Sequence, residues 1–221
     1  MSGNIFFGKG QTALITGGRT RLGAAFATHL EQRGYAVLRH SHTNTPGFLG
    51  ADLGKPSGVH TLLAQLSAPV SVLIANAGVL WRNDDNTKAM WRVNNTSPRA
   101  LALGLAARWP DAGGIIIFIT DAQPPEDEAF SRYRASKRAL QKALLPLAQQ
   151  LAPKWRVHAL APGAVLQAPT ESLEHFETMR AKAPLGGIGI SDLTGALDFL
   201  LTAPKVTGLS IAVDGGSRLC R

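Results

Sequence analysis

Residues 11–30 read QTALITGGRTRLGAAFATHL and combine a short apolar run, a glycine-containing turn and a helical pattern. The apolar run, 11–15, is typical of a buried parallel strand. Glycines let the backbone approach a pyrophosphate, and the N-terminus of the next helix attracts its negative charge. The stretch predicts a dinucleotide-binding turn; a tight turn without a ligand is the alternative. Candidate contacts are Thr16, Gly17, Arg19, Arg21, Leu22 and Gly23.

A second apolar run, 35–39, ends in the segment Arg39-His40-Ser41-His42-Thr43. Enzymes of this type that use NAD usually carry an acid at this point, which binds the ribose 2′-hydroxyl. No acid is present, and basic and hydroxyl groups suit a 2′-phosphate. His40, Ser41 and His42 therefore indicate NADPH, with loop histidines of no special role as the alternative.

The remaining sequence alternates apolar runs with helical patterns. Further strands are expected at 48–53, 70–75, 115–119, 156–160 and 209–213, and helices at 24–34, 57–66, 87–108, 131–151, 171–181 and 191–201. This alternation predicts a doubly wound, Rossmann-type α/β fold, with helices on both faces of a parallel sheet and ligands at the carboxyl ends of the strands. Residues 1–221 are expected to form a single domain.

Tyr133 and Lys137 lie four residues apart at the start of one predicted helix. This spacing places both side chains on one face. The ammonium is expected to lower the pKa of the phenol from about 10, so that the tyrosine can transfer a proton. A chance pair of surface residues is the alternative.

The composition indicates a globular protein and argues against a nucleic-acid-binding or membrane-spanning one. Of 221 residues, 45% are hydrophobic and 17% charged, which is typical of a globular protein. The formal charge is +8, but Lys and Arg are scattered, which argues against nucleic acid as a partner. No apolar run approaches the roughly 18 residues of a membrane span. Cys220 is the single cysteine, so no internal disulfide can form, and a cytoplasmic location is expected.

Taken together, the motifs resemble the short-chain dehydrogenase/reductase family over the whole chain. They are Thr16-Gly17-x-x-x-Arg21-x-Gly23, Asp52, Asn76-Ala77-Gly78, Asn94, Tyr133-x-x-x-Lys137, Pro162-Gly163 and Asp214-Gly215-Gly216. The resemblance implies catalytic roles for Tyr133 and Lys137, with Asn94 supporting a water that relays protons. It also implies cofactor contacts from Asp52, Leu53, Asn76, Ala77, Gly78, Tyr133, Lys137, Pro162 and Gly163.

Three departures resemble the pteridine and dihydromonapterin reductases of that family. Arg21 stands where the family commonly has glycine, His40-Ser41-His42 ends the second strand, and Asp121 follows the fifth strand where the family usually has serine. The resemblance implies an NADPH-dependent reductase of a dihydropterin, with Asp121 in the catalytic site. If Thr120 occupies that position instead, an ordinary carbonyl reductase is expected. A non-catalytic NADPH-binding sensor is a further alternative, and no metal site is expected.

Assembly is expected to follow the family as well. The helices at 87–108 and 131–151 look apolar on more than one face, and such faces need a partner. The residues concerned are Leu101, Leu103, Leu105, Leu140, Leu144 and Leu147. The resemblance and this pattern together predict a homotetramer, or at least a dimer.

Overall fold

The computed structural model describes residues 8–83, 86–122, 124–168 and 171–220. Its strands are β1 (Thr12–Ile15), β2 (Ala36–Ser41), β3 (Leu49–Gly50), β4 (Val72–Ala75), β5 (Gly114–Ile119), β6 (Trp155–Pro162) and β7 (Ser210–Val213). Its α-helices are α1 (Arg21–Gln32), α2 (Gly58–Ala64), α3 (Thr87–Trp91), α4 (Ser97–Arg108), α5 (Ser131–Lys142), α6 (Leu144–Leu151), α7 (Leu173–Ala181) and α8 (Ile190–Thr202). None of the helices in these ranges is long and apolar enough to cross a bilayer.

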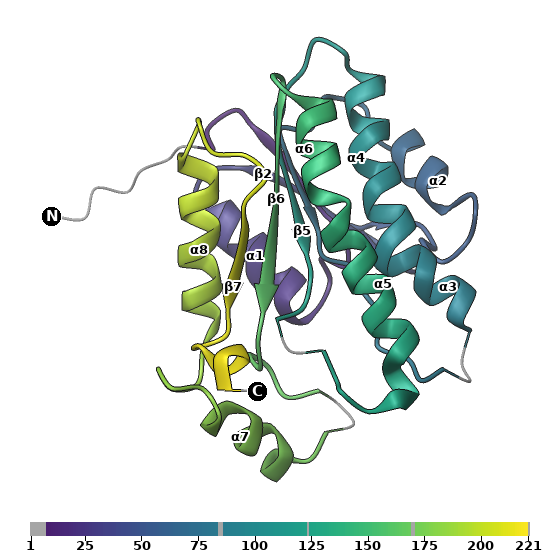
Figure 1. Ribbon diagram of the computed structural model, residues 1–221. Coiled ribbons are helices and arrows are strands. Elements are labelled where there is room, and N and C mark those ends of the chain that lie inside the picture. The colour runs from purple at the N-terminus through teal and green to yellow at the C-terminus, as the bar shows by residue number, and fades with distance from the viewer. Residues whose placement is uncertain (1–7, 84–85, 123, 169–170, 221) are drawn as a thin grey trace, which may run out of the picture.

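The strands form one parallel sheet in the order β3-β2-β1-β4-β5-β6-β7. The chain moves outward from β1 on one side and from β4 on the other, so the strand order reverses between them. Ligands bind at this switch point in doubly wound sheets, because the loops after the two strands diverge there. The predicted doubly wound fold is confirmed (Figure 1).

Two apolar cores cover the two faces of the sheet. Along β5, Ile116 and Phe118 pack with α2, α4, α5 and α6, whereas Ile115, Ile117 and Ile119 pack with α1 and α8. Successive side chains of a strand point to opposite faces, so a continuous apolar run is what a sheet covered on both sides requires. Figure 1 shows the two helical layers, with α1 and α8 on one side and α2 to α6 on the other.

Two predicted helices are interrupted. The helix expected at 87–108 consists of α3, a π-helical turn over Arg92–Thr96, and α4. The helix expected at 131–151 breaks at Ala143, between α5 and α6. Pro98 and Pro146 explain the positions, because a proline has no N–H for the carbonyl four residues earlier and its ring crowds that carbonyl. The third strand is also shorter than expected, Leu49–Gly50.

Candidate active site

A cleft of about 1080 Å³ opens at the carboxyl ends of the strands. One side is built by the turn after β1 and by Asn76, Ala77 and Gly78 after β4. The other side is built by the ends of β5 and β6 and by α7. The fold thus gathers residues that lie far apart in the sequence, as the topology predicts.

The turn between β1 and α1 is shaped by close backbone contacts. Gly17 has a φ of 63°, and a Cβ at Gly23 would lie 2.0 Å from the Gly17 carbonyl oxygen. Both positions therefore require glycine. Asn76 Nδ2 donates to the carbonyl of Thr16 (3.0 Å), and the Ala77 N–H donates to Thr16 Oγ1 (2.9 Å). These bonds fix the turn against the end of β4.

His40 binds backbone with both ring nitrogens. The Gly17 N–H donates to Nδ1 (3.0 Å), so Nε2 carries the proton and donates to the Ala51 carbonyl (2.8 Å). Burial lowers the pKa of this imidazole, and the backbone bond to Ala51 only partly opposes the shift. The neutral ring in this arrangement has no further donor for a phosphate, so its contribution is to hold the glycine turn in place.

The other polar residues near the end of β2 differ in exposure. Ser41 is buried, with Oγ 3.4 Å from Thr45 Oγ1. His42 is exposed and lines the cleft; its Nδ1 lies 3.4 Å from Asp52 Oδ1. Leu53 also lines the cleft. Arg19 is exposed on the glycine turn.

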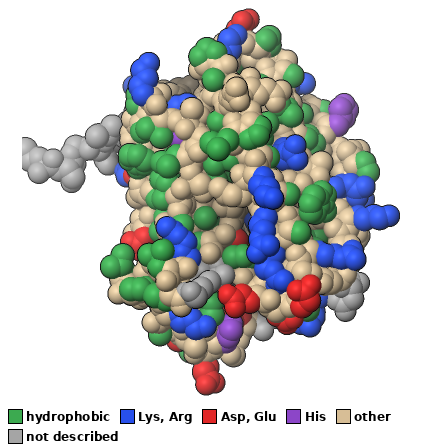
Figure 2. All heavy atoms as spheres, viewed as in Figure 1, with side chains coloured by type: hydrophobic (Ala, Val, Ile, Leu, Met, Phe, Trp, Pro, Cys, Tyr) green, Lys and Arg blue, Asp and Glu red, His purple; other side chains and the backbone are tan. Residues whose placement is uncertain are grey.

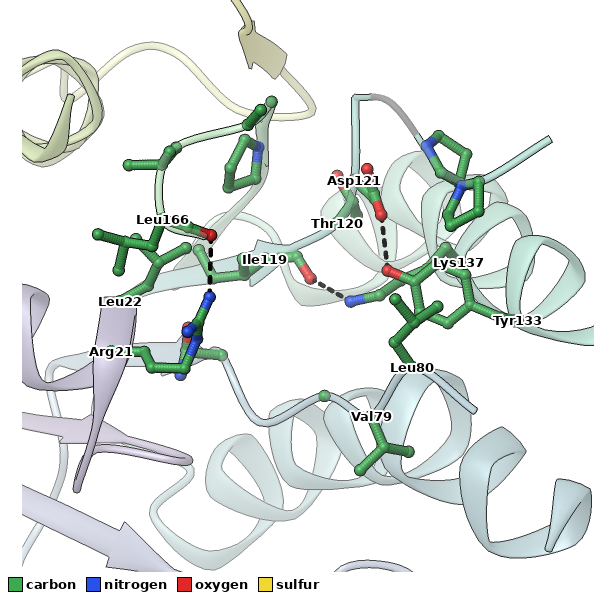
Figure 3. A pocket seen from close by; sticks show the side chains of 18 of the residues that line it. Arg21, Leu22, Val79, Leu80, Ile119, Thr120, Asp121, Tyr133, Lys137 and Leu166 are labelled. Carbon is green, nitrogen blue, oxygen red and sulfur yellow. Dashed lines mark hydrogen bonds between the residues drawn. The ribbon is translucent and has the colours of Figure 1, made fainter. Parts of the chain in front are cut away.

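Asp121 and Tyr133 form the shortest polar contact in the cleft. The phenol donates to Asp121 Oδ2 at 2.6 Å (Figure 3). Thr120 also lines the cleft, but it is buried and its hydroxyl donates to the Leu160 carbonyl on β6 (3.5 Å). Neighbours on an extended segment point to opposite sides, so only one of the two can meet Tyr133. In this structure that residue is Asp121.

Lys137 lies beside this pair, fully within the protein. Its Nζ donates to the Ile119 carbonyl (3.0 Å) and lies 6.0 Å from the centre of the Tyr133 ring. Burial lowers the pKa of this ammonium, while the Asp121 charge opposes the shift.

The expectation that Lys137 lowers the pKa of Tyr133 is wrong for this structure. Burial raises the pKa of the phenol well above 10, and the charge and hydrogen bond of Asp121 raise it further. A carboxylate that accepts a hydrogen bond from the phenol stabilises the neutral phenol, and desolvation disfavours phenolate. Tyr133 is therefore held protonated.

Asn94 lies in the π-helical turn, and its side chain is fixed from two directions. Oδ1 accepts from the Val79 N–H (2.9 Å), while Nδ2 donates to the Val79 carbonyl (2.8 Å) and to Ser136 Oγ (3.2 Å). Ser136, which the sequence reasoning missed, donates to the Tyr133 carbonyl (2.7 Å). Its position directly before Lys137 was the available signal.

Gly78 brings the backbone close to Lys137. A Cβ at this position would lie 3.4 Å from both Asn94 Oδ1 and Lys137 Nζ, so the bare backbone faces these two side chains. Pro162 and Gly163 line the same cleft opposite. Together with the N-terminus of α1 and the cleft volume, these residues fit a bound dinucleotide.

The cleft lining also includes Arg21 and several residues for which the sequence predicted no individual contact. Arg21 reaches across the cleft and donates to the carbonyls of Leu166 (3.0 Å) and Gln167 (2.9 Å). The segment around α7 and the C-terminus contributes Glu171, His175, Phe176, Met179, Lys182, Ser217 and Cys220. Their position follows from how α7 packs over the sheet edge, which no local pattern encodes.

The family model described as short chain dehydrogenase matches residues 11–178. The dihydromonapterin reductase of Citrobacter koseri is 28% identical over 231 residues, covering 93% of this chain and 96% of the relative.

Solved structures agree in fold. FolM alternative dihydrofolate reductase 1 from Brucella canis, crystallised with NADP, has a TM-score of 0.87 and 26% identity, covering 97% of this chain and 96% of that chain. A gluconate 5-dehydrogenase from Burkholderia cenocepacia, in complex with NADP and tartrate, has a TM-score of 0.85 but only 22% identity, covering 97% of each chain. The second likeness concerns the fold alone.

Proposed function

The chain belongs to the short-chain dehydrogenase family of oxidoreductases, and from that membership we propose that it is an NADPH-dependent reductase of a dihydropterin, of the dihydromonapterin type. The observation that carries the proposal is the 2.6 Å hydrogen bond between Tyr133 and Asp121 in the cleft. Relatives named dihydromonapterin reductase, and the FolM structure with NADP, support the substrate class and the cofactor.

An acid at this position fits an imine better than a ketone. A dihydropterin is reduced at C6=N5: carbon receives a hydride, and N5 receives a proton. Bound NADPH supplies the hydride. The phenol of Tyr133 holds the proton, and the Asp121 carboxylate orients the phenol or shares its proton. The carboxylate can also accept hydrogen bonds from the amino-pyrimidine ring.

Lys137 and Asn94 support this proton donor. The Lys137 ammonium, held by the Ile119 carbonyl, would bind the nicotinamide ribose and stabilise negative charge on the phenol oxygen as the proton leaves. Asn94 fixes the Val79 backbone against α5. We propose that it also supports a water that returns protons towards Lys137.

The remaining cofactor contacts follow the cleft. Asp52 and Leu53 would flank the adenine, Arg19, Ser41 and His42 the 2′-phosphate, and the glycine turn the pyrophosphate. His40 serves this binding indirectly, by holding the Gly17 N–H. The other candidate contacts are Thr16, Arg21, Leu22, Gly23, Asn76, Ala77, Gly78, Pro162 and Gly163.

The test measures NADPH oxidation with dihydromonapterin, dihydrobiopterin, dihydrofolate and several ketones. Asp121→Ala is compared with Thr120→Ala, its neighbour at the strand end, whose hydroxyl bonds the Leu160 carbonyl. We expect dihydropterin turnover to fall more in Asp121→Ala, with thermal melts excluding unfolding. Full dihydropterin turnover in folded Asp121→Ala would overturn the mechanism. Ketone turnover that depends on Thr120 would indicate a carbonyl reductase instead.

We also propose a cytoplasmic homotetramer. Five of the leucines expected to contact a partner are buried in this chain's own core: Leu101, Leu105, Leu140, Leu144 and Leu147. The same helical layer nevertheless exposes Trp91 (42%), Leu103 (37%) and Leu145 (66%), which support a partner there.

A further inference from the structure

Arg21 has a backbone conformation that its side chain disfavours. Its φ is 54°, and it is the one non-glycine residue with a positive φ in the part of the chain that the structure describes. The left-handed region crowds the Cβ of an L-residue, and glycine is free of this penalty. An arginine at this position therefore needs a compensating interaction from its side chain.

The guanidinium provides that interaction across the cleft. It donates through Nη1 to the Gln167 carbonyl (2.9 Å) and through Nη2 to the Leu166 carbonyl (3.0 Å). Figure 3 shows the side chain reaching from the glycine turn to Leu166. A planar guanidinium presents two donors in a fixed fork, and the single ammonium of lysine cannot reproduce this geometry.

The segment that receives these bonds forms a wall of the cleft. Pro162, Gly163, Ala164, Val165 and Leu166 all line it. Val165 and Leu166 pack against the apolar core beneath, so that core holds the segment from one side. At its far end, the Ala168 N–H donates to Glu171 Oε2 (2.9 Å), which is a local bond. Arg21 supplies a polar tie from the opposite wall.

We propose that Arg21 is a positioning residue, whose guanidinium ties residues 166–167 to the glycine turn and thereby fixes the separation of the two walls of the cleft. The tie exists in the protein chain alone, so it does not depend on the identity of the substrate. Its kinetic consequence rests on the proposed function: a loosened wall should weaken binding of the pterin more than binding of NADPH.

The first experiment measures amide hydrogen exchange of the full-length protein without ligands. Arg21→Lys keeps the positive charge but loses the two forked donors of the guanidinium. Arg21→Gly loses both the charge and the donors, but glycine adopts the positive φ without strain. Both variants should exchange faster over residues 164–168, by roughly tenfold. The melting temperature of Arg21→Gly should stay close to that of the parent protein. Lys205→Ala, which removes an exposed charge elsewhere, should exchange like the parent. Parental exchange at 164–168 in both folded Arg21 variants would overturn the proposal.

The second experiment separates positioning from direct phosphate binding. In Arg21→Lys we expect the KM for the dihydropterin to rise roughly tenfold, while the Kd for NADPH changes less, because the charge remains. A variant with weakened NADPH binding but parental exchange would make Arg21 a cofactor ligand and overturn the tie. If no pterin is reduced by the parent protein, the proposed function fails, and the exchange experiment still decides the role of Arg21.

Discussion

Tyr133 keeps its proton in this structure because of its immediate neighbours. Burial and the Asp121 carboxylate both disfavour phenolate and raise the pKa of this phenol. The Tyr133 phenol can therefore act as an acid only when a bound substrate accepts its proton, or when the negative charge of Asp121 has been removed. The proton donor that we propose is therefore Tyr133 acting together with Asp121.

Asp121→Asn should lower the pKa of Tyr133. The substitution removes the negative charge, which is one of the causes that raise this pKa, and offers the phenol a neutral amide oxygen in place of the carboxylate; burial stays in place. The chain has two tyrosines, Tyr35 and Tyr133, so phenolate absorbance can be followed against pH in a Tyr35→Phe background. An unchanged titration in the Asn variant would contradict the coupling of the two residues.

Tyr133→Phe should lose turnover by about 10²–10⁴-fold, since general acid catalysis contributes about that much. NADPH binding should be largely retained, because most of its proposed contacts lie elsewhere in the cleft. Steady-state kinetics and a binding titration with NADPH test the two parts, and a thermal melt serves as the control. Turnover that survives the substitution would exclude the phenol as the proton donor.

At the scale of elements, the end of β2 carries the residues that we propose to select the cofactor. Glu31 binds Arg39 through both carboxylate oxygens (2.8 Å each), and His40 binds backbone. The glycine turn and the end of β2 still present Arg19 and His42 to solvent. No acid lies on this segment, so the local charge favours a phosphate over a ribose hydroxyl.

NADPH should be preferred over NADH by about ten- to hundredfold in kcat/KM, since a charge-assisted contact contributes roughly 1.5–3 kcal/mol. Arg19→Ala should reduce this preference, whereas Lys205→Ala should leave it unchanged. Kinetics with both cofactors test the prediction. Equal kcat/KM values for NADPH and NADH in the parent protein would contradict it.

Strand β6 carries a buried histidine that links stability to pH. His158 is fully buried, and burial, followed by the Arg156 charge, lowers its pKa to about 4, against opposition from the backbone at Leu209 and Val206. Below the unfolded-state pKa of about 6.5, the unfolded chain binds a proton that the folded chain does not bind until about pH 4. The neutral ring therefore supports full stability above pH 6.5 and loses it as pH falls.

The free energy of unfolding should decrease between pH 6.5 and 4 by up to about 3 kcal/mol through this residue. Asp and Glu carboxylates also titrate in acid and change the stability. The measurement therefore compares urea unfolding of the parent with that of His158→Gln. The variant lacks the titrating ring, and its stability should fall less steeply. Identical slopes in the two proteins would contradict the prediction.

At the scale of the whole molecule, the helices of one layer contain basic residues but no acidic ones. The sequences of α3, α4, α5, α6 and the π-helical turn contain no Asp or Glu. Their basic residues are Lys88, Arg92, Arg99, Arg108, Arg132, Arg134, Lys137, Arg138 and Lys142. Figure 2 shows blue side chains gathered over the right half of the view, where this layer lies in Figure 1, with red side chains at its lower edge. Two copies that meet through this layer would bring like charges together.

Assembly should therefore strengthen as salt rises from low to physiological concentration, because ions screen the repulsion between exposed charges. Light scattering at micromolar protein concentration measures the effect. Leu145→Asp should weaken association if exposed apolar area drives it, and Lys205→Ala, outside the layer, serves as the control. A stable, active monomer at every salt concentration would contradict assembly through this face.

Much of the fold follows from the sequence alone. Apolar runs bounded by turns marked the strands, and the glycines at positions 17 and 23 marked the turn, because these features are local and backbone geometry dictates them. The helix breaks were also encoded, since Pro98 and Pro146 lack the N–H that a continuous helix needs. Residues at the strand ends could be assigned to one cleft because parallel strands end on the same edge.

Only the tertiary structure decided which groups meet in that cleft. The strand pattern left Thr120 and Asp121 open, and the 2.6 Å contact with Tyr133 depends on the path of the chain between β5 and α5. His40 binds backbone instead of solvent, and Arg21 reaches carbonyls at Leu166 and Gln167, far along the chain. The pKa of Tyr133 rises for the same reason: burial and neighbouring charge come from packing, which residue spacing does not specify.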